Sequence, residues 1–318
     1  MTAIRTPGPV NPSTTLIDVG LWGVEGTGSA YLVRAGRTCL VDTGSRPVAG
    51  RLAATLRALD AWPPDMVILT HAHYDHSQGV PPLRRRFPDL RVMAGRDSVP
   101  LLADQSWNRL FPQVRRLVNV PGVQPLDDGE VIDLDGLTLE VIDTPGHTPG
   151  HIALLDRENS NLLAGDVLGF CFGGQTLVPS ITARCWDPRA FDSSLARLRS
   201  VEFGSVCIGH FGCISGDEAG RLVESAERSR DLWWSIMERV AGEEGLDDID
   251  RLTGILRTEA EVHMPDLRVW RPGLRALLGL VNGGRRLVGR PPLTVAEVLF
   301  PQLVQMLVDG YRCSVGEA

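Results

Sequence analysis

The segment THAHYDH, residues 70–76, places three histidines and one aspartate directly after the apolar run DMVILT. The whole chain has 318 residues and only seven histidines. Side chains two positions apart in an extended segment point to the same side, so His71 and His73 share one side of the chain. Crowding imidazoles beside the carboxylate of Asp75 costs desolvation energy, which a bound divalent cation offsets. The pattern therefore predicts a metal site at the end of a buried strand.

Four donors in one loop cannot all reach one ion in good geometry, so we expect further ligands from elsewhere in the chain. His147 lies in the Pro- and Gly-rich segment DTPGHTPGH, Asp166 follows the apolar run NLLAG, and His210 follows SVCIG. A Gly-Asp pair after a strand is by itself typical of a turn. The occurrence of all three segments behind HAHYDH is what supports the metal-site hypothesis.

The distribution of apolar residues predicts a β-rich body followed by a helical tail. Between residues 16 and 215, short β-rich runs alternate with amphipathic segments and Gly/Pro turns. Strands are expected at 30–36, 37–44, 65–70, 137–144, 151–156, 161–166 and 205–210, and helices at 48–59 and 187–200. One long helix is expected at 217–245, with three more at 248–262, 272–288 and 294–310. The order favours an α/β or α+β fold with a helical appendix.

These motifs, in this order, resemble the metallo-β-lactamase fold superfamily in its di-metal hydrolase branch, over about residues 16–215. The resemblance implies an α+β fold, an αββα sandwich with a C-terminal helical extension. It implies an N-terminal extension at 1–15, a catalytic domain at 16–216, and a helical subdomain at 217–318 that covers the site.

The same resemblance implies a role for each candidate site residue. The first metal ion would be held by His71, His73 and His147. The second would be held by Asp75, His76 and His210, with Asp166 bridging the two ions. Asp42, in LVDTG, and His151 would hold the ligand loops and orient the imidazoles.

The implied reaction is hydrolysis at two divalent metal ions, zinc in the first place, with iron or manganese as alternatives. A hydroxide shared by the two ions would attack a carbonyl, and Asp75 would orient that nucleophile as the catalytic residue. The chain contains no G-x-S-x-G motif, which disfavours a serine hydrolase.

The substrate is less constrained than the reaction. The favoured substrate is a small-molecule thioester or other acyl ester. A lactonase, an iron-dependent protein similar to persulfide dioxygenases, and a binding module that has kept the fold remain alternatives. The segment TPGHTPGH resembles glyoxalase II, but no glutathione site is recognisable in the longer tail. Phe170, Phe172 and Arg184, in the irregular segment 168–186, are the expected substrate contacts.

Charge and hydropathy narrow the choice of partners. The net charge of −7 and the lack of a large basic patch disfavour nucleic acid. No apolar run reaches the ~20 residues of a membrane span, and the N-terminus lacks the apolar core of a signal peptide, so we expect no membrane partner and a cytoplasmic location. The large apolar residues of the tail, Trp233 and Trp234 among them, are expected mainly to form the tail's own core. As an exposed pair, Trp233 and Trp234 would alternatively form a pocket wall or a contact between the subunits of a homodimer.

Overall fold

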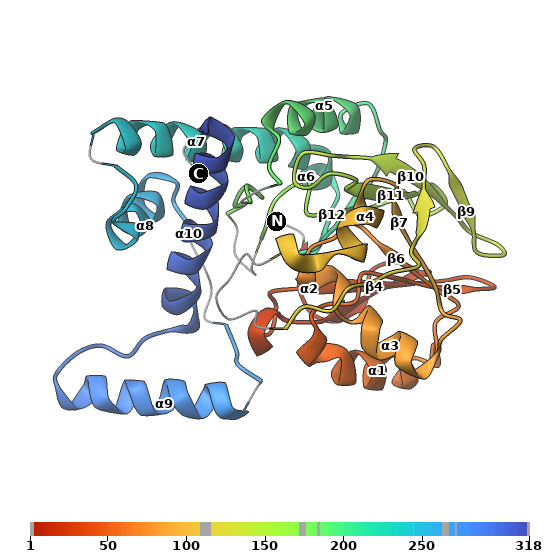
Figure 1. The fold of residues 1–318 in the computed structure, drawn as a ribbon, viewed down its shortest axis with the longest axis horizontal. Coiled ribbons are helices and arrows are strands. Elements are labelled where there is room, and N and C mark those ends of the chain that lie inside the picture. Colours follow the sequence, from red (N-terminus) through yellow and green to blue (C-terminus); the bar gives the residue numbers. More distant parts are fainter. Residues whose placement is uncertain are drawn as a thin grey trace.

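The fold is that of a computed structural model, which describes residues 3–108, 116–171, 176–182, 185–243, 245–262, 267–270 and 272–316 (Figure 1). Two seven-stranded sheets form the body. The first sheet has the order β2-β3-β4-β5-β6-β7-β8, with bounds Gly8–Pro9, Thr14–Asp18, Ser29–Arg34, Thr38–Val41, Met66–Leu69, Arg91–Gly95 and Gln124–Leu126. β2 to β5 pair antiparallel, and β5 to β8 pair parallel.

The second sheet has the order β1-β14-β13-β12-β11-β10-β9. Its strands, in chain order, are Ala3–Ile4, Val131–Asp133, Thr138–Asp143, Ile152–Asp156, Asn161–Gly165, Ser205–Ile208 and Gly212–Ser215. All neighbours pair antiparallel except β12 and β13, which are parallel. The first residues of the chain thus add a strand to this sheet, where Ala3 pairs with Ile214.

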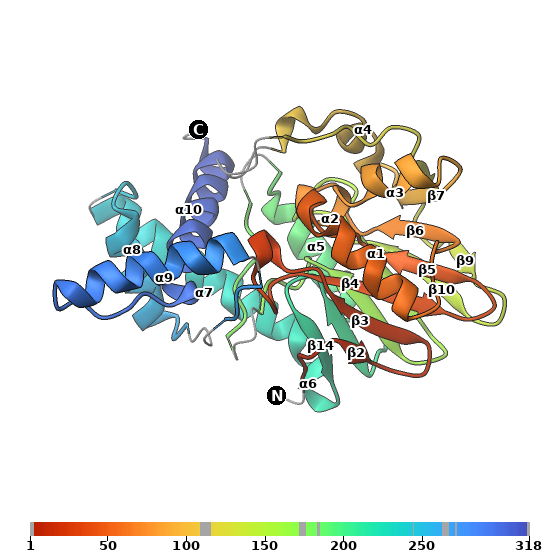
Figure 2. The ribbon, with the colours of Figure 1, turned by 90° about the horizontal axis from the view of Figure 1, so that it is seen from below.

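Helices cover the outer face of each sheet (Figures 1 and 2). The helices of the body are α1 (Ala49–Ala58), α2 (Tyr74–Ser77), α3 (Val80–Arg86), α4 (Ser98–Ala103), α5 (Pro188–Leu198) and α6 (Asp217–Gly220). Short 3-10 helices lie at Leu21–Gly23, Arg46–Val48 and Gln105–Trp107. One apolar core lies between the sheets and joins Tyr31 to Leu154. A second lies beneath α1 and α3, and a third beneath α5 and the tail. The layers follow the order helix, sheet, sheet, helix, as predicted.

The tail consists of α7 (Leu222–Glu243), α8 (Ile249–Glu259), α9 (Pro272–Leu287) and α10 (Val295–Val315). The helix expected at 217–245 is interrupted at Arg221, between α6 and α7, because α6 continues the turn that leaves β14. None of the helices described is both long and apolar enough to span a membrane.

The tail aromatics mainly serve its own packing. Trp233 is only 1% exposed and lies against Phe300 of α10, so the expectation that it forms an exposed pair with Trp234 is wrong. Trp234 packs against Tyr311, at 4.8 Å between ring centroids. The helical period explains the difference, since neighbouring positions point about 100° apart and only one of them faces the core.

Candidate metal centre

The candidate ligands all follow strand ends, and the two sheets bring those ends to one edge of the sandwich. His71 and His73 follow β6 directly, and α2 then carries Asp75 and His76. The other three candidates come from the second sheet: His147 from the loop between β10 and β11, Asp166 from the residue after β12, and His210 from the turn between β13 and β14. The carboxyl ends of β6, β12 and β13 therefore meet at a single buried site.

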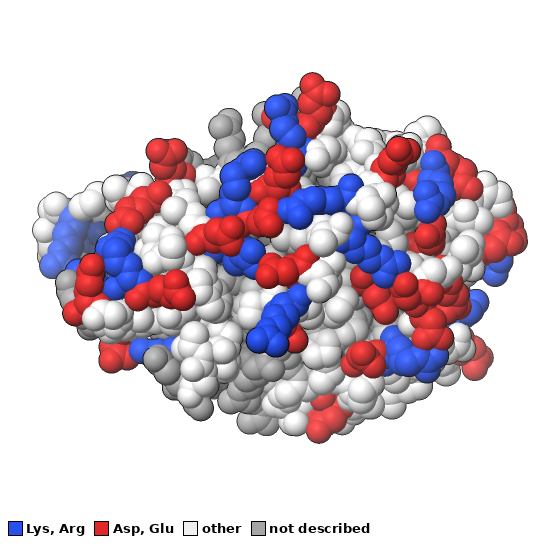
Figure 3. Space-filling model, turned by 90° about the horizontal axis from the view of Figure 1, so that it is seen from above, with Lys and Arg blue, Asp and Glu red and all other residues white. Residues whose placement is uncertain are grey.

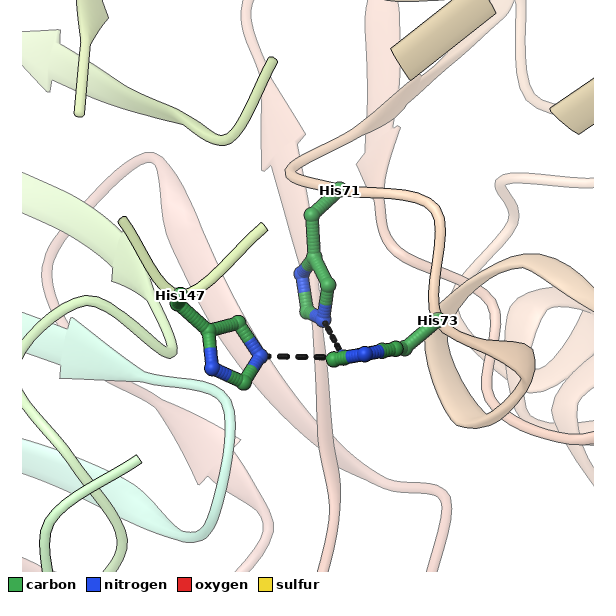
Figure 4. A group of neighbouring side chains, drawn as sticks. All are labelled: His71, His73 and His147. Atoms are coloured by element: carbon green, nitrogen blue, oxygen red, sulfur yellow. Dashed lines mark hydrogen bonds between the residues drawn. The ribbon is translucent and has the colours of Figure 1, made fainter. Parts of the chain in front are cut away.

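Three imidazoles form the first group of donors (Figure 4). The Nδ1 atom of His73 lies 2.9 Å from the Nε2 atom of His71 and 2.9 Å from that of His147. All three side chains are at most 2% exposed. Three ring nitrogens that converge in this way are a common arrangement for holding one divalent ion.

The second group consists of Asp75, His76 and His210, whose donor atoms lie within 4.8 Å of one another. The Nε2 atoms of His76 and His210 are 3.3 Å apart. The Oδ2 atom of Asp75 is 3.4 Å from the Nε2 atom of His210. Asp75 is the least buried of the three.

Asp166 lies between the two groups. Its Oδ2 atom is 3.5 Å from the Nε2 atom of His147 in the first group. It is also 3.4 Å and 3.3 Å from the Nε2 atoms of His76 and His210 in the second. One carboxylate oxygen therefore faces both groups, which is the position of a bridging ligand.

Asp42 organises ligands of both groups from outside the site. Its Oδ2 atom accepts a hydrogen bond from Nδ1 of His76 at 2.8 Å, so the neutral imidazole of His76 has its lone pair on Nε2, facing inward. The Thr70 hydroxyl donates to the same carboxylate at 2.8 Å, and the Thr70 N–H donates at 2.9 Å. Because that hydroxyl hydrogen is used, Thr70 accepts from Nδ1 of His71 at 3.0 Å, which leaves Nε2 of His71 free as well.

Backbone carbonyls orient two other ligands in the same way. The Nδ1 atom of His147 donates to the Ser180 carbonyl at 2.7 Å, and that of His210 donates to the Thr27 carbonyl at 2.6 Å. A carbonyl only accepts, so both neutral rings carry their lone pairs on Nε2. Four imidazoles thus present lone pairs inward because their outer nitrogens are engaged.

His151 has a different role from its neighbours. Its Nε2 atom accepts the backbone N–H of Asp166 at 3.1 Å, and its Nδ1 atom is paired with the Thr144 hydroxyl at 2.8 Å. Both ring nitrogens are therefore used, and the ring supports the backbone that carries the Asp166 carboxylate.

Burial sets the charge of the first group. It lowers the pKa of His71 and His73 well below the ordinary histidine value and also lowers the pKa of His147. Burial lowers the pKa of His151 to about 3. These rings are neutral at physiological pH, which is the form that coordinates metal.

The second group responds to its carboxylates. Burial lowers the pKa of His76, but the charges of Asp166 and Asp42 outweigh it and raise that pKa well above the ordinary value. Asp166 and Asp75 raise the pKa of His210 against the same effect of burial. Burial would raise the pKa of Asp166, yet the imidazoles of His210 and His76 hold it well below its usual range. Without a metal ion, His76 and His210 bind protons more readily than ordinary histidines do.

The donor set fits two divalent ions. The Oδ1 atom of Asp166 is buried without a hydrogen-bond partner among the described residues. A buried carboxylate oxygen without a donor is costly, and a cation relieves that cost. Two carboxylates and five imidazoles suit zinc, iron or manganese alike.

A glycine makes room for the bridge. A Cβ atom at Gly209 would collide with Oδ1 of Asp166 and lie 2.9 Å from Cε1 of His76. The residue before His210 can therefore carry no side chain while Asp166 keeps its place.

Two aromatic rings border the ligands. Phe170 stands edge-on to His210 at 4.8 Å between centroids, and it is 3% exposed. The ring of Trp107 lies beside that of His73, at 5.6 Å between centroids. Of the expected substrate contacts, Phe172 and Arg184 lie outside the described residues, and Phe170 lies at the site.

Sequence reasoning missed the groups that orient the ligands, namely Thr70, Trp107, Gly209 and the carbonyls of Thr27 and Ser180. Thr70 carried a signal, because it directly precedes the histidine motif and can bond to it. The two carbonyls carried none, since every residue has one.

Comparison with known proteins identifies the class. Residues 23–210 match the family model of the metallo-beta-lactamase superfamily, and the chain belongs to this superfamily. A metallo-beta-lactamase family protein of Thermus thermophilus has a similar structure, with a TM-score of 0.60, 24% identity and coverage of 79% of this chain and 90% of that one. An archaeal superfamily member from Sulfolobus tokodaii follows at a TM-score of 0.57 and 22% identity, covering 79% and 96%. These likenesses show the fold, which confirms the predicted fold class.

Curated relatives include a hydroxyacylglutathione hydrolase and a thioesterase. The hydroxyacylglutathione hydrolase of Aeromonas hydrophila is 35% identical over 176 residues, which are 54% of this chain and 56% of that protein. An atrochrysone carboxyl ACP thioesterase of Aspergillus fumigatus is 32% identical over 152 residues, covering 47% and 42%. The chain thus spans about half the length of the curated relatives it matches.

Proposed function

We propose that this protein is a metal-dependent hydrolase of thioesters, with other acyl esters as a secondary substrate class. The observation that carries the proposal is the convergence of inward lone pairs from His71, His76, His147 and His210 on the carboxylate of Asp166. One of the curated relatives is named as a thioesterase and another as a hydroxyacylglutathione hydrolase, which supports a hydrolase with that substrate class.

The residues divide the work as follows. The first ion would be held by His71, His73 and His147. The second ion would be held by Asp75, His76 and His210. Asp166 would contact both ions. Two bound divalent ions, zinc in the first place, would polarise the substrate carbonyl and lower the pKa of a water molecule toward neutrality.

Asp75 is the proposed catalytic residue beyond its role as a ligand. Its carboxylate reaches His210 at 3.4 Å yet is less buried than the other ligands. It can therefore accept a hydrogen bond from the attacking nucleophile and orient it toward the carbonyl carbon. Phe170 and Trp107 would exclude water beside the histidines and favour an apolar acyl group.

A substrate panel tests the proposal. The full chain, loaded with zinc, manganese or iron, is assayed with acyl-glutathione and acyl-CoA thioesters by thiol release and with lactones by acid release. Chelated protein is the control, and oxygen uptake with the iron form tests the dioxygenase alternative. We expect thioester turnover that chelation abolishes. Turnover of lactones alone, or none above the chelated control, would overturn it.

A further inference from the structure

Helix α9 has no buried residue, although it is amphipathic. Its large apolar side chains recur at helical spacing and lie along one side. They are Leu274, Leu277, Leu280, Val281 and Leu287, which are 37%, 57%, 75%, 41% and 89% exposed. Val288, just past the helix end, is 70% exposed. We call these six residues the α9 apolar face.

Among the described residues, Leu278 and Asn282 join the helix to the rest of the protein. Leu278 packs against the small cluster of Val24, Leu267 and Val295. The Asn282 side chain accepts the Leu293 N–H at 2.7 Å and donates to its carbonyl at 3.0 Å. Figure 1 shows α9 at the edge of the tail, below the helices α7, α8 and α10. The apolar face thus points away from the described protein.

The charge along this stretch of the sequence has one sign. Residues 267–293 contain six arginines and no aspartate or glutamate, in a chain whose net charge is −7. Arg275, Arg286 and Arg290 are exposed, and no arginine of α9 has an ion-pair partner among the described residues. Elsewhere arginines alternate with acids, as Figure 3 shows and as the pairs Arg239–Glu259 and Arg230–Asp192 illustrate.

We infer that α9 docks onto an anionic lipid surface. A basic amphipathic helix with an exposed apolar face lies in the plane of a membrane, with its apolar residues among the acyl chains and its arginines at the phosphates. Such a helix needs no membrane span, so the lack of a spanning segment does not bear on it. A two-fold contact with a second copy is the alternative that the experiment below separates from lipid binding.

A position at the membrane would also place the tail close to apolar substrates. Residues 267–270, which lead into α9, pair with the loop before β4: the Trp270 N–H donates to the Gly23 carbonyl at 3.0 Å, and the Glu25 N–H to that of Arg268 at 2.8 Å. The same loop holds His210 through the Thr27 carbonyl. The inference itself rests on α9 and not on the proposed reaction.

Vesicle sedimentation tests the inference with the full chain. The vesicles are phosphatidylcholine alone or an equal mixture with phosphatidylglycerol. We expect binding to the mixed vesicles that weakens with added salt, and weak binding to phosphatidylcholine alone. The double variant L277E/L280E should partition at least about tenfold less, since it places charges in the acyl region. Val131→Glu, at an exposed apolar residue of β9 that is 57% accessible, is the matched control and should bind as the parent does.

Other results overturn the inference. The inference fails if the parent protein does not sediment with the mixed vesicles, or if L277E/L280E and the parent sediment equally. A parent dimer in light scattering that L277E/L280E dissociates, without vesicle binding, would assign the face to a second copy. Equal unfolding temperatures of all variants would show that the substitutions act at the surface.

Discussion

Replacing Asp42 by Asn tests whether ligand orientation depends on a residue that lies outside both donor groups. The Asp42 carboxylate accepts three hydrogen bonds, from the Thr70 N–H and hydroxyl and from Nδ1 of His76. Asn keeps the size of the side chain and tolerates the positive φ of 61° at this position, so the backbone is retained. Its amide nitrogen, however, is a donor and meets a donor on Thr70 or His76.

The magnitude follows from the bonds lost. A hydrogen bond to a charged group contributes about 1.5–3 kcal/mol. If Asn keeps its carbonyl oxygen toward the Thr70 N–H, its amide nitrogen takes the place of Oδ2 and faces both the Thr70 hydroxyl and Nδ1 of His76. The neutral ring of His76 then carries its hydrogen on Nε2, which points toward the metal position. We expect metal affinity to fall by about 10–100-fold, which corresponds to about 1.4–2.8 kcal/mol.

Competition with a chelator measures the metal affinity, and the metal content per chain is measured beside it. Asp65→Asn is the matched control, because Asp65 accepts the N–H and hydroxyl of Thr38 at 2.7 Å and 2.8 Å on the exposed surface, in the same way as Asp42 does with Thr70. That variant should bind metal as the parent does. Parent affinity in folded Asp42→Asn protein would refute the reasoning, as would an equal loss in Asp65→Asn.

Three other perturbations have defined outcomes. Gly209→Ala should bind less than two metal equivalents, because its Cβ displaces the Asp166 carboxylate, whereas Gly254→Ala, with open space around it, should bind two. Gly310→Ala on α10 brings a Cβ to 2.8 Å from Ile181 and 2.9 Å from Thr182. It should lower the free energy of unfolding in urea by about 1–3 kcal/mol. It should also weaken metal binding by His147, because the segment of Ile181 and Thr182 carries the Ser180 carbonyl that orients this ring. Unaltered stability and metal content would contradict this. Metal affinity should fall as pH falls, because His76 and His210 have raised pKa values and protons therefore compete with metal for their Nε2 atoms. Calorimetry in buffers of different ionisation enthalpy should show that metal binding releases protons. An affinity that does not change with pH would contradict this expectation.

The strands that lead to the ligands were largely predictable, whereas helix α2, which carries Asp75 and His76, was expected to be a turn. The strand expected at 65–70 is β6, that at 161–166 is β12, and that at 205–210 is β13. Each is a short β-rich run closed by a turn residue, so the local pattern suffices. The weaker strands β7 and β14 were not predicted, because three to five apolar residues without clear boundaries resemble any buried segment.

The helical tail shows the limit of periodicity. Four tail helices were expected and four are found, as α7 to α10, with α6 as a separate turn before them. The pattern did not distinguish the apolar residues that form the tail core from those that remain exposed. Trp233 is buried and Leu280 is exposed, yet both lie on amphipathic helices.

The sequence by itself determined the donor types and the strand ends on which they lie, because a buried run followed by His or Asp is a local property. The tertiary structure decided which donors meet. It placed Oδ2 of Asp166 between two groups that each combine ligands from both sheets, and set Thr27 and Ser180 behind His210 and His147. These contacts depend on how two sheets stack and on backbone carbonyls that every residue possesses. No local pattern encodes them, so they follow only from the packed fold.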